Sequence, residues 1–290
     1  MGANLEIRKW GVVGAGTMGN GIAQVAATAG FDTVLVDIAP AALEKGLGAI
    51  GRSLDRLVAK GKLDADGAAA VRGRIASGTA LDALAGCDLV VEAVVEKLEV
   101  KSRVLADLDA QLPAHALLAT NTSSISITKL AARTGRPDRV IGMHFMNPVP
   151  VMQLVEIIRG LQTAQSTYDA IEAATRRLGK TPVEVHDAPG FVSNRVLMPM
   201  INEAIYCLHE GVGKASAIDE VMKLGMNHPM GPLALADLIG LDVCLDILRV
   251  LHDGLGEDKY RPCPLLVKMV DAGYLGRKSG RGFHDYSSAG

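Results

Sequence analysis

Short apolar runs alternate with segments of helical periodicity through the first two thirds of the chain. Continuous β-prone runs predict strands at residues 10–13, 33–37, 88–94, 117–121, 139–144, 154–158 and 182–185. Apolar positions three and four residues apart predict helices at residues 19–29, 97–110, 125–132 and 168–178. Strands that alternate with helices in this way are typical of a mostly parallel sheet wrapped by helices, so we expect an α/β fold.

Residues 41–76 interrupt this alternation, because they carry helical periodicity and no strand signal. We expect a helical hairpin there, inserted between two strands, with its turn at residues 60–62. Four side chains make the hairpin locally basic: Arg52, Arg56, Lys60 and Lys62. A solvated charged face is the ordinary interpretation of such a cluster.

The pattern changes after residue 187 and is helical from there onward. Pro189 and Gly190 mark the break. Helices are predicted over residues 192–209, 216–224, 233–252 and 264–272. Pro199 should kink the first of them, and Ser216 is a suitable N-cap for the second. The third is either one long helix or two helices that join near Gly240.

We therefore expect two domains: an α/β domain over residues 1–187 and an all-α domain over residues 188–290. The methionines scattered through the second domain are core filler or line a subunit interface. An all-helical domain this small gains stability from a partner, so a homodimer is expected.

Composition limits the class of protein. Hydrophobic residues make up 49% of the 290 residues, enough for a sizeable core, and the formal net charge of −2 disfavours a general nucleic-acid-binding surface. No apolar run approaches the roughly 18 residues of a membrane span, and residues 1–8 lack the apolar core of a secretory signal. None of the four cysteines forms a C-x-x-C pair, which fits buried or incidental thiols in a reducing compartment. We expect a cytoplasmic protein that neither carries a metal nor binds a membrane or nucleic acid.

The first predicted turn carries the pattern G-x-G-x-x-G, formed by Gly14, Gly16 and Gly19. Gly14 permits the tight turn, Gly16 lets the backbone approach a pyrophosphate, and Gly19 lets the next helix pack closely. The N-terminus of that helix offers N–H groups to phosphates. Asp37, 23 residues after Gly14, can accept hydrogen bonds from both hydroxyls of an adenosine ribose, whereas a 2′-phosphate would meet like charge. The sequence therefore predicts a Rossmann-like domain that binds NAD rather than NADP.

His144 differs from the other histidines because it ends a predicted strand. Open α/β sheets hold ligands at the carboxyl ends of their strands. Glu156 lies in the next strand, between Val155 and Ile157, and a carboxylate among aliphatic side chains needs a partner. A pair across the intervening turn is geometrically reasonable, and the carboxylate would then orient the imidazole as a general base.

Four segments resemble the L-3-hydroxyacyl-CoA dehydrogenase family in order and spacing: residues 14–19, 121–124, 144–150 and 189–195. The resemblance runs from Lys9 to Tyr286 and is closest to the short, single-function bacterial members, which act on 3-hydroxybutyryl-CoA. It implies NAD-dependent interconversion of a short-chain (S)-3-hydroxyacyl-CoA and its 3-ketoacyl-CoA. The early start of the first domain, with no hydratase region before it, argues against the large multifunctional members.

The resemblance also assigns the catalytic positions. His144 matches the family's base, and Glu156 matches the acid that orients it. Ser123 matches a serine that contacts the substrate oxygen and the nicotinamide side. Asn194 matches an asparagine that completes the site from the second domain.

Further positions match cofactor and substrate contacts of the family. The cofactor positions are Gly14, Ala15, Gly16, Thr17, Met18, Gly19, Asp37, Glu96, Lys101, Asn121, Asn147 and Lys278. Ser53 and Lys60 match hairpin residues that touch CoA, so charges of the basic hairpin are now expected to meet the CoA phosphates.

Two other functions remain open. A dehydrogenase of a free hydroxy acid could use a similar two-domain plan, but it would have no need for the basic hairpin. A non-catalytic, structural NAD-binding protein could tolerate the loss of His144, Glu156 or Asn194, yet all three are present.

Overall fold

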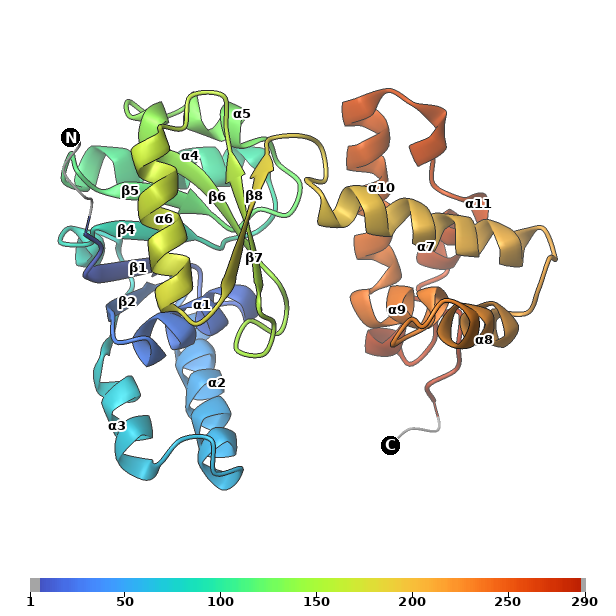
Figure 1. Ribbon diagram of the computed structural model, residues 1–290, viewed down its shortest axis with the longest axis horizontal. Coiled ribbons are helices and arrows are strands. Elements are labelled where there is room, and N and C mark those ends of the chain that lie inside the picture. The colour runs from blue at the N-terminus through green and yellow to red at the C-terminus, as the bar shows by residue number, and fades with distance from the viewer. Residues whose placement is uncertain (1–5, 288–290) are drawn as a thin grey trace. The chain divides into compact units, whose positions relative to one another are not determined.

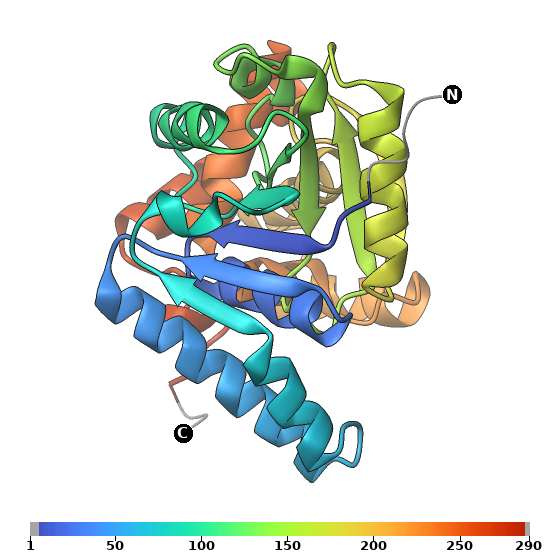
Figure 2. The same cartoon turned by 90° about the vertical axis from the view of Figure 1, so that its left-hand side faces the viewer.

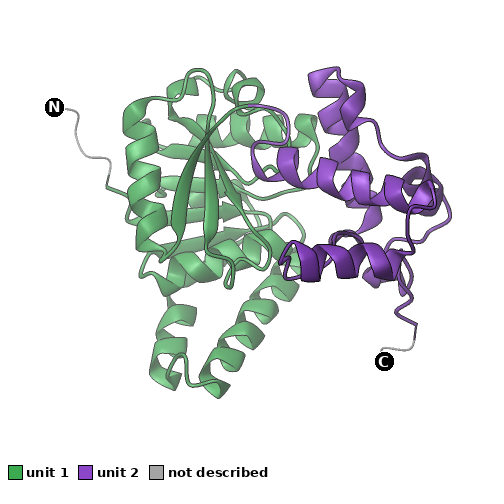
Figure 3. Ribbon diagram, turned by 45° about the vertical axis from the view of Figure 1, so that its right-hand side comes forward, with its two compact units in different colours: residues 1–187 green, residues 188–290 purple. Residues whose placement is uncertain are grey.

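The computed structural model describes residues 6–287. The first five residues of the polar N-terminal segment and the last three residues of the chain lie outside this range. The chain divides into two compact units, unit 1 over residues 1–187 and unit 2 over residues 188–290 (Figure 3).

Unit 1 is built on an eight-stranded sheet. Its strands are β1 (Lys9–Val13), β2 (Asp32–Val36), β3 (Ile75–Gly78), β4 (Leu89–Glu92), β5 (Leu117–Thr120), β6 (Val140–Phe145), β7 (Leu154–Arg159) and β8 (Thr181–His186). They lie in the order β3-β2-β1-β4-β5-β6-β7-β8, and the β6–β7 pair is antiparallel while the other neighbours are parallel (Figure 2). The chain reverses its direction of travel across the sheet between β1 and β4, which is where doubly wound sheets bind ligands. The expected α/β fold with a mostly parallel sheet is confirmed.

Helices cover both faces of this sheet. Those of unit 1 are α1 (Thr17–Thr28), α2 (Pro40–Ala59), α3 (Ala65–Gly73), α4 (Leu98–Gln111), α5 (Ile127–Ala131) and α6 (Gln165–Arg177), with 3-10 turns η1 (Leu81–Leu84) and η2 (Pro137–Arg139). In Figure 1, α6 lies in front of the sheet and α4 behind it. Trp10 of β1 contacts Phe31 with ring centroids 5.2 Å apart, in the core that also buries Ile22 of α1 and Ile171 of α6. This core fixes β1 and α1, the two elements on either side of the glycine-rich turn.

The predicted helical hairpin is present as α2 and α3, which lie side by side and project from the sheet (Figures 1 and 2). Gly61 turns the chain between them with a φ of +64°. The expectation that residues 41–76 hold no strand was wrong, because Ile75–Gly78 forms β3 at the sheet edge. Ile75 is its single large apolar side chain, so backbone pairing with β2, rather than a buried face, makes this segment a strand.

Unit 2 is helical, as expected. Its helices are α7 (Ser193–His209), α8 (Ala215–Gly225), α9 (Pro232–Ile239), α10 (Leu241–Leu255) and α11 (Pro264–Asp271), with 3-10 turns η3 (Asp258–Tyr260) and η4 (Arg277–Ser279). Pro199 lies inside α7. Gly240, with a φ of +106°, separates α9 from α10. Of the two alternatives left open by the sequence, two helices are therefore present. The assignment of Ser216 as an N-cap was wrong: α8 begins one residue earlier, so Lys214 is the cap and the serine hydroxyl lies within the first turn.

Candidate active site

The three glycines of the turn between β1 and α1 serve different purposes. Gly14 has a φ of +99°, a left-handed backbone that favours glycine. A Cβ on Gly19 would clash with the carbonyl oxygen of Gly14, so only glycine lets α1 pack on the turn. A Cβ on Gly16 would meet open space, which leaves its backbone accessible to a ligand. In the described structure no side chain caps the N-terminus of α1, so its N–H groups can face a phosphate.

Asp37 follows β2 and is tied to the same turn. Its Oδ2 accepts a hydrogen bond from the backbone N–H of Ala15 at 2.8 Å, and its Oδ1 accepts one from the N–H of Ala39 at 3.0 Å. Each carboxylate oxygen has a second lone pair, so ribose hydroxyls can still donate to Asp37. Ala15 is buried and its N–H is used inside the turn, which indicates that this residue shapes the turn.

A pocket of about 860 Å³ is lined by this turn. One side of the lining comes from the turn and the end of β2: Gly14, Gly16, Thr17, Met18, Asp37 and Ile38. Another side follows the chain from β4 into α4: Ala93, Val94, Val95, Glu99, Val100 and Arg103. Largely apolar walls, with Asp37 beside an uncapped helix N-terminus, fit the adenosine and pyrophosphate of a dinucleotide.

His144 and Glu156 form a buried pair. They face each other across the antiparallel β6–β7 ladder, and Nδ1 of His144 lies 2.8 Å from Oε2 of Glu156. Direct cross-strand neighbours place their side chains on the same face, which explains why residues 12 apart in sequence meet. The two side chains are 10% and 3% exposed. The carboxylate orients the ring through Nδ1, so proton exchange with a substrate falls to Nε2.

Glu96 joins the loop after β4 to the loop after β5. Its Oε1 accepts hydrogen bonds from the backbone N–H groups of Ser123 at 2.8 Å and Ser124 at 3.2 Å, and from the hydroxyl of Thr122. Burial alone would raise the pKa of the Glu96 carboxyl, but the Lys101 ammonium and these hydrogen bonds outweigh burial and hold the pKa below its usual value. Glu96 is therefore ionised at neutral pH and fixes the segment that carries Ser123.

Lys101 is buried between two carboxylates, with its side chain 1% exposed. Its Nζ lies 2.7 Å from Oε1 of Glu92 and 3.2 Å from Oε2 of Glu96. Glu92, fully buried at the end of β4, was missed in the sequence analysis. The signal was present, because an acid inside the apolar run 88–94 needs a partner for the same reason that Glu156 does.

Asn121 connects the ends of two neighbouring strands. Its Oδ1 accepts a hydrogen bond from the backbone N–H of Phe145 at 2.9 Å, directly after His144. Asn147, two residues after Phe145 in the chain, is exposed. Asn121 therefore acts on the site through the backbone of β6.

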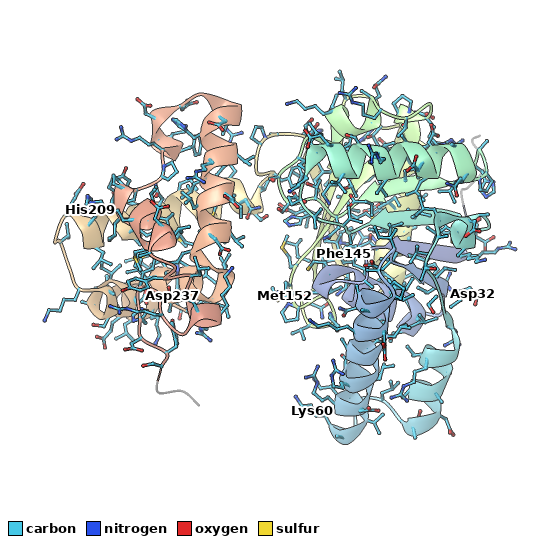
Figure 4. The ribbon with its side chains drawn as sticks, turned by 180° about the vertical axis from the view of Figure 1, so that it is seen from behind. Asp32, Lys60, Phe145, Met152, His209 and Asp237 are labelled. Atoms are coloured by element: carbon cyan, nitrogen blue, oxygen red, sulfur yellow. The ribbon has the colours of Figure 1, made fainter. Side chains whose placement is uncertain are left out.

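Lys180 is a second residue that the sequence analysis missed. Its Nζ donates hydrogen bonds to the carbonyl oxygens of Val149 and Met152, both at 2.7 Å. Figure 4 labels Phe145, the last residue of β6, and Met152, which lies in the loop that these contacts hold. Burial lowers the pKa of the Lys180 ammonium. An unpatterned lysine between a helix and a strand gives no sequence signal of this kind.

Four residues predicted from the sequence as site residues are not among the interacting residues described above. Ser53 and Lys60 are on and at the end of α2, with Lys60 exposed (Figure 4), and neither lines the pocket at the glycine turn. Asn194 is buried in the first turn of α7 in unit 2. Lys278 also belongs to unit 2, where its Nζ lies 2.6 Å from each carboxylate oxygen of Asp242.

Among residues 6–287, no helix is both long and apolar enough to cross a membrane. In the same part of the chain, no group of three or more His, Cys, Asp or Glu side chains is arranged to hold a metal ion.

The glycine turn, the acid after the second strand and the pocket between them define a dinucleotide-binding protein of the Rossmann class. A family model of the NAD binding domain of 3-hydroxyacyl-CoA dehydrogenase matches residues 9–188. A model of the C-terminal domain of 3-hydroxyacyl-CoA dehydrogenase matches residues 190–286. The chain therefore belongs to the 3-hydroxyacyl-CoA dehydrogenase family, which confirms the resemblance seen in its motifs.

Individual relatives match nearly end to end. The 3-hydroxybutyryl-CoA dehydrogenase of Bradyrhizobium diazoefficiens is 56% identical over 283 residues, which cover 98% of this chain and 97% of the relative. That of Clostridioides difficile is 48% identical over 279 residues, covering 96% and 99%. The crystal structure of (S)-3-hydroxybutyryl-CoA dehydrogenase from Ralstonia eutropha is 54% identical, covers 98% of this chain and 100% of its own, and superposes with a TM-score of 0.95.

Proposed function

We propose that this protein catalyses the NAD-dependent interconversion of a short-chain (S)-3-hydroxyacyl-CoA and the matching 3-ketoacyl-CoA. The observation that carries the proposal is the buried His144–Glu156 pair at the carboxyl end of β6, in the same unit as the dinucleotide pocket. Family membership supports the reaction, and the names of the relatives support 3-hydroxybutyryl-CoA and acetoacetyl-CoA as the substrate pair.

The residues of the glycine turn fit NAD. When bound, NAD supplies the nicotinamide carbon that accepts a hydride or returns it. Gly14, Gly16 and the N-terminus of α1 hold the pyrophosphate, and Thr17 and Met18 line the same wall. Gly19 and Ala15 shape the turn from behind.

His144 is the general acid–base of the proposed reaction. In oxidation its Nε2 takes the proton of the 3-hydroxyl, and in reduction it gives that proton back to the 3-oxygen. Glu156 stabilises the imidazolium that forms. By family resemblance, Ser123 and Asn194 hold the substrate oxygen and thioester.

Some of the remaining cofactor positions are assigned to contact the cofactor, and others act on it through a neighbouring residue. Glu96, Asn147 and Lys278 are assigned to the cofactor itself by resemblance. Lys101 acts through Glu96, because its ammonium is enclosed by carboxylates, and Asn121 acts through the backbone of β6.

The hairpin helix α2 is assigned to the CoA nucleotide. A Cβ on Gly46 would lie 2.6 Å from the carbonyl oxygen of Ala15, so α2 passes close beside the glycine turn before it projects away. Ser53 and Lys60 follow on the same helix, two turns apart, and Lys60 offers an exposed positive charge. An anionic phosphate is the natural partner for that charge.

A homodimer through unit 2 is part of the proposal. Large apolar side chains are exposed on its helices and the residues that follow them: Val196, Val221, Leu224, Met226, Leu238 and Val243. Light scattering at micromolar concentration tests this point, and a monomer would contradict it. A cytoplasmic location stays a prediction.

The activity itself is tested by NADH oxidation. We expect rapid NADH oxidation with acetoacetyl-CoA, and little with free acetoacetate at the same concentration. Equal rates with both would favour the dehydrogenase of a free hydroxy acid. No oxidation with any 3-ketoacyl-CoA from C4 to C16, despite NADH binding, would favour the structural NAD-binding protein.

A further inference from the structure

Glu92, Lys101 and Glu96 form a trio of two carboxylates and one ammonium, in which Glu92 and Lys101 are buried and the Glu96 side chain is 37% exposed. The Lys101 ammonium lies 2.7 Å from the Glu92 carboxylate and 3.2 Å from that of Glu96. We propose that the net charge of −1 on this trio sets how strongly the site prefers the oxidised over the reduced cofactor. The inference rests on the proposed function, since it concerns how that cofactor is held.

The trio is rigid because all four carboxylate oxygens have partners. Oε1 of Glu92 accepts hydrogen bonds from Lys101 and from the backbone N–H of Val94, both at 2.7 Å. Oε2 of Glu92 accepts one from the hydroxyl of Thr120 at 2.8 Å. Glu96 uses one oxygen for Lys101 and the other for the loop after β5. The charges therefore keep fixed positions.

The charges of the trio do not cancel. Two carboxylates share one ammonium, and Glu92 and Lys101 are 0% and 1% exposed. The lowered pKa of Glu96 keeps the third member ionised. Water screens the charges of Glu92 and Lys101 poorly, so removing one of them changes the electrostatic potential several ångströms away.

The trio lies at the strand ends of the switch point, next to residues that line the pocket. Glu92 is the last residue of β4, in register with Val13 of β1 and Thr120 of β5. Ala93 and Val94, the next residues in the chain, line the pocket itself. A dinucleotide straddles such a switch point, so with its adenosine half at Asp37 its nicotinamide half falls on the β4–β5 side.

The two redox forms of the cofactor differ at this half by one charge. The oxidised nicotinamide ring is positively charged and the reduced ring is neutral. A fixed negative charge nearby stabilises the oxidised form and leaves the reduced form almost unaffected. A purely structural cluster would instead affect both forms alike.

The decisive variant is Glu92→Gln, which keeps the size of the side chain and removes one negative charge. The dissociation constants of NAD⁺ and NADH are measured by isothermal titration calorimetry, and the readout is their ratio. We expect the ratio Kd(NAD⁺)/Kd(NADH) to rise about 4- to 17-fold, the effect of one charge at roughly 10 Å with an effective dielectric constant of about 20–40. Glu96→Gln removes a charge from a more exposed member and should shift the ratio in the same direction.

Two controls leave the charge of the trio unchanged. Thr120→Val removes the hydroxyl that donates to Glu92, and Glu172→Gln removes a surface carboxylate on α6. Both should leave the ratio within about twofold of the unmodified protein. If Thr120→Val shifts it as much as Glu92→Gln does, geometry rather than charge sets the ratio, and the inference is wrong.

The outcomes separate this inference from the proposed function. If the unmodified protein binds neither cofactor form, the proposed function fails and the inference fails with it. If both forms bind but Glu92→Gln and Glu96→Gln weaken them equally, the inference alone fails. If thermal denaturation shows that Glu92→Gln does not fold, the ratio in Glu96→Gln decides.

Discussion

The carboxylate of Asp37 accepts a hydrogen bond from the backbone N–H of Ala15 at 2.8 Å, so the residue expected to bind the adenosine ribose also braces the glycine turn. The two roles cannot be separated by removing the side chain. Asp37→Ala should weaken NADH and NADPH together, because the turn loses its brace. Asp37→Asn keeps one hydrogen-bond acceptor and removes the negative charge. It should therefore reduce the preference for NADH over NADPH in kcat/KM.

The unmodified protein should prefer NADH over NADPH by on the order of 10- to 1000-fold in kcat/KM. A 2′-phosphate would remove one donor to Asp37 and add repulsion. The residues that follow, Ile38, Ala39 and Pro40, offer no cation to compensate. Steady-state rates with both cofactors and acetoacetyl-CoA measure the preference. Comparable use of NADPH would rule out this role for Asp37.

The glycines at positions 16 and 19 should respond differently to alanine. Gly19→Ala forces a Cβ onto the carbonyl oxygen of Gly14, so both Tm and NAD affinity should fall. Gly16→Ala meets open space in the unliganded fold, so Tm should stay within about 2 °C, while NAD affinity falls because the methyl group occupies the phosphate approach. Calorimetry without cofactor and NAD titration separate the two effects. An unchanged Tm in Gly19→Ala would contradict the packing argument.

Motifs and periodicity predicted most of the fold because buried strands such as β4 and β5 are continuous apolar runs. They failed at β3, because this edge strand has no buried face and therefore no apolar pattern in the sequence. They also could not choose between one and two helices at Gly240, because a positive φ is not visible in the sequence.

The candidate site was likewise only partly predictable from the sequence. The pairing of His144 with Glu156 followed from an acid inside an apolar strand, and the antiparallel register brings the two together. Glu92 carries that signal equally, but the partner Lys101 lies on a helix, where strand patterns give no guide. Lys180 could not be found from sequence, because its partners are backbone carbonyls, which every residue carries.

Lys60 tests the assignment of the hairpin to CoA. Lys60→Ala should raise KM for acetoacetyl-CoA about 3- to 5-fold with little change in kcat, since one exposed charge contact is lost. Lys62, exposed on the same hairpin turn, gives the matched control, and Lys62→Ala should have a smaller effect. The effect of Lys60→Ala should disappear with a substrate analogue truncated before the nucleotide. A KM that rises equally for that analogue would disprove a contact with the CoA phosphates.

His144 and Glu156 should have separable effects on catalysis. His144→Gln keeps a polar side chain of similar length but cannot exchange the proton, so kcat should fall by roughly 100-fold or more. Glu156→Gln keeps a hydrogen-bond acceptor for Nδ1 but removes the charge that stabilises the imidazolium, so kcat should fall less, by about 10-fold or more. The double variant should be close to His144→Gln alone, because Glu156 acts only through the histidine. NAD affinity, measured by titration, should change little in all three, and far-UV circular dichroism should show an intact fold. Near-normal kcat in a folded His144→Gln variant would exclude His144 as the acid–base. Additive losses in the double variant would show that Glu156 contributes by another route.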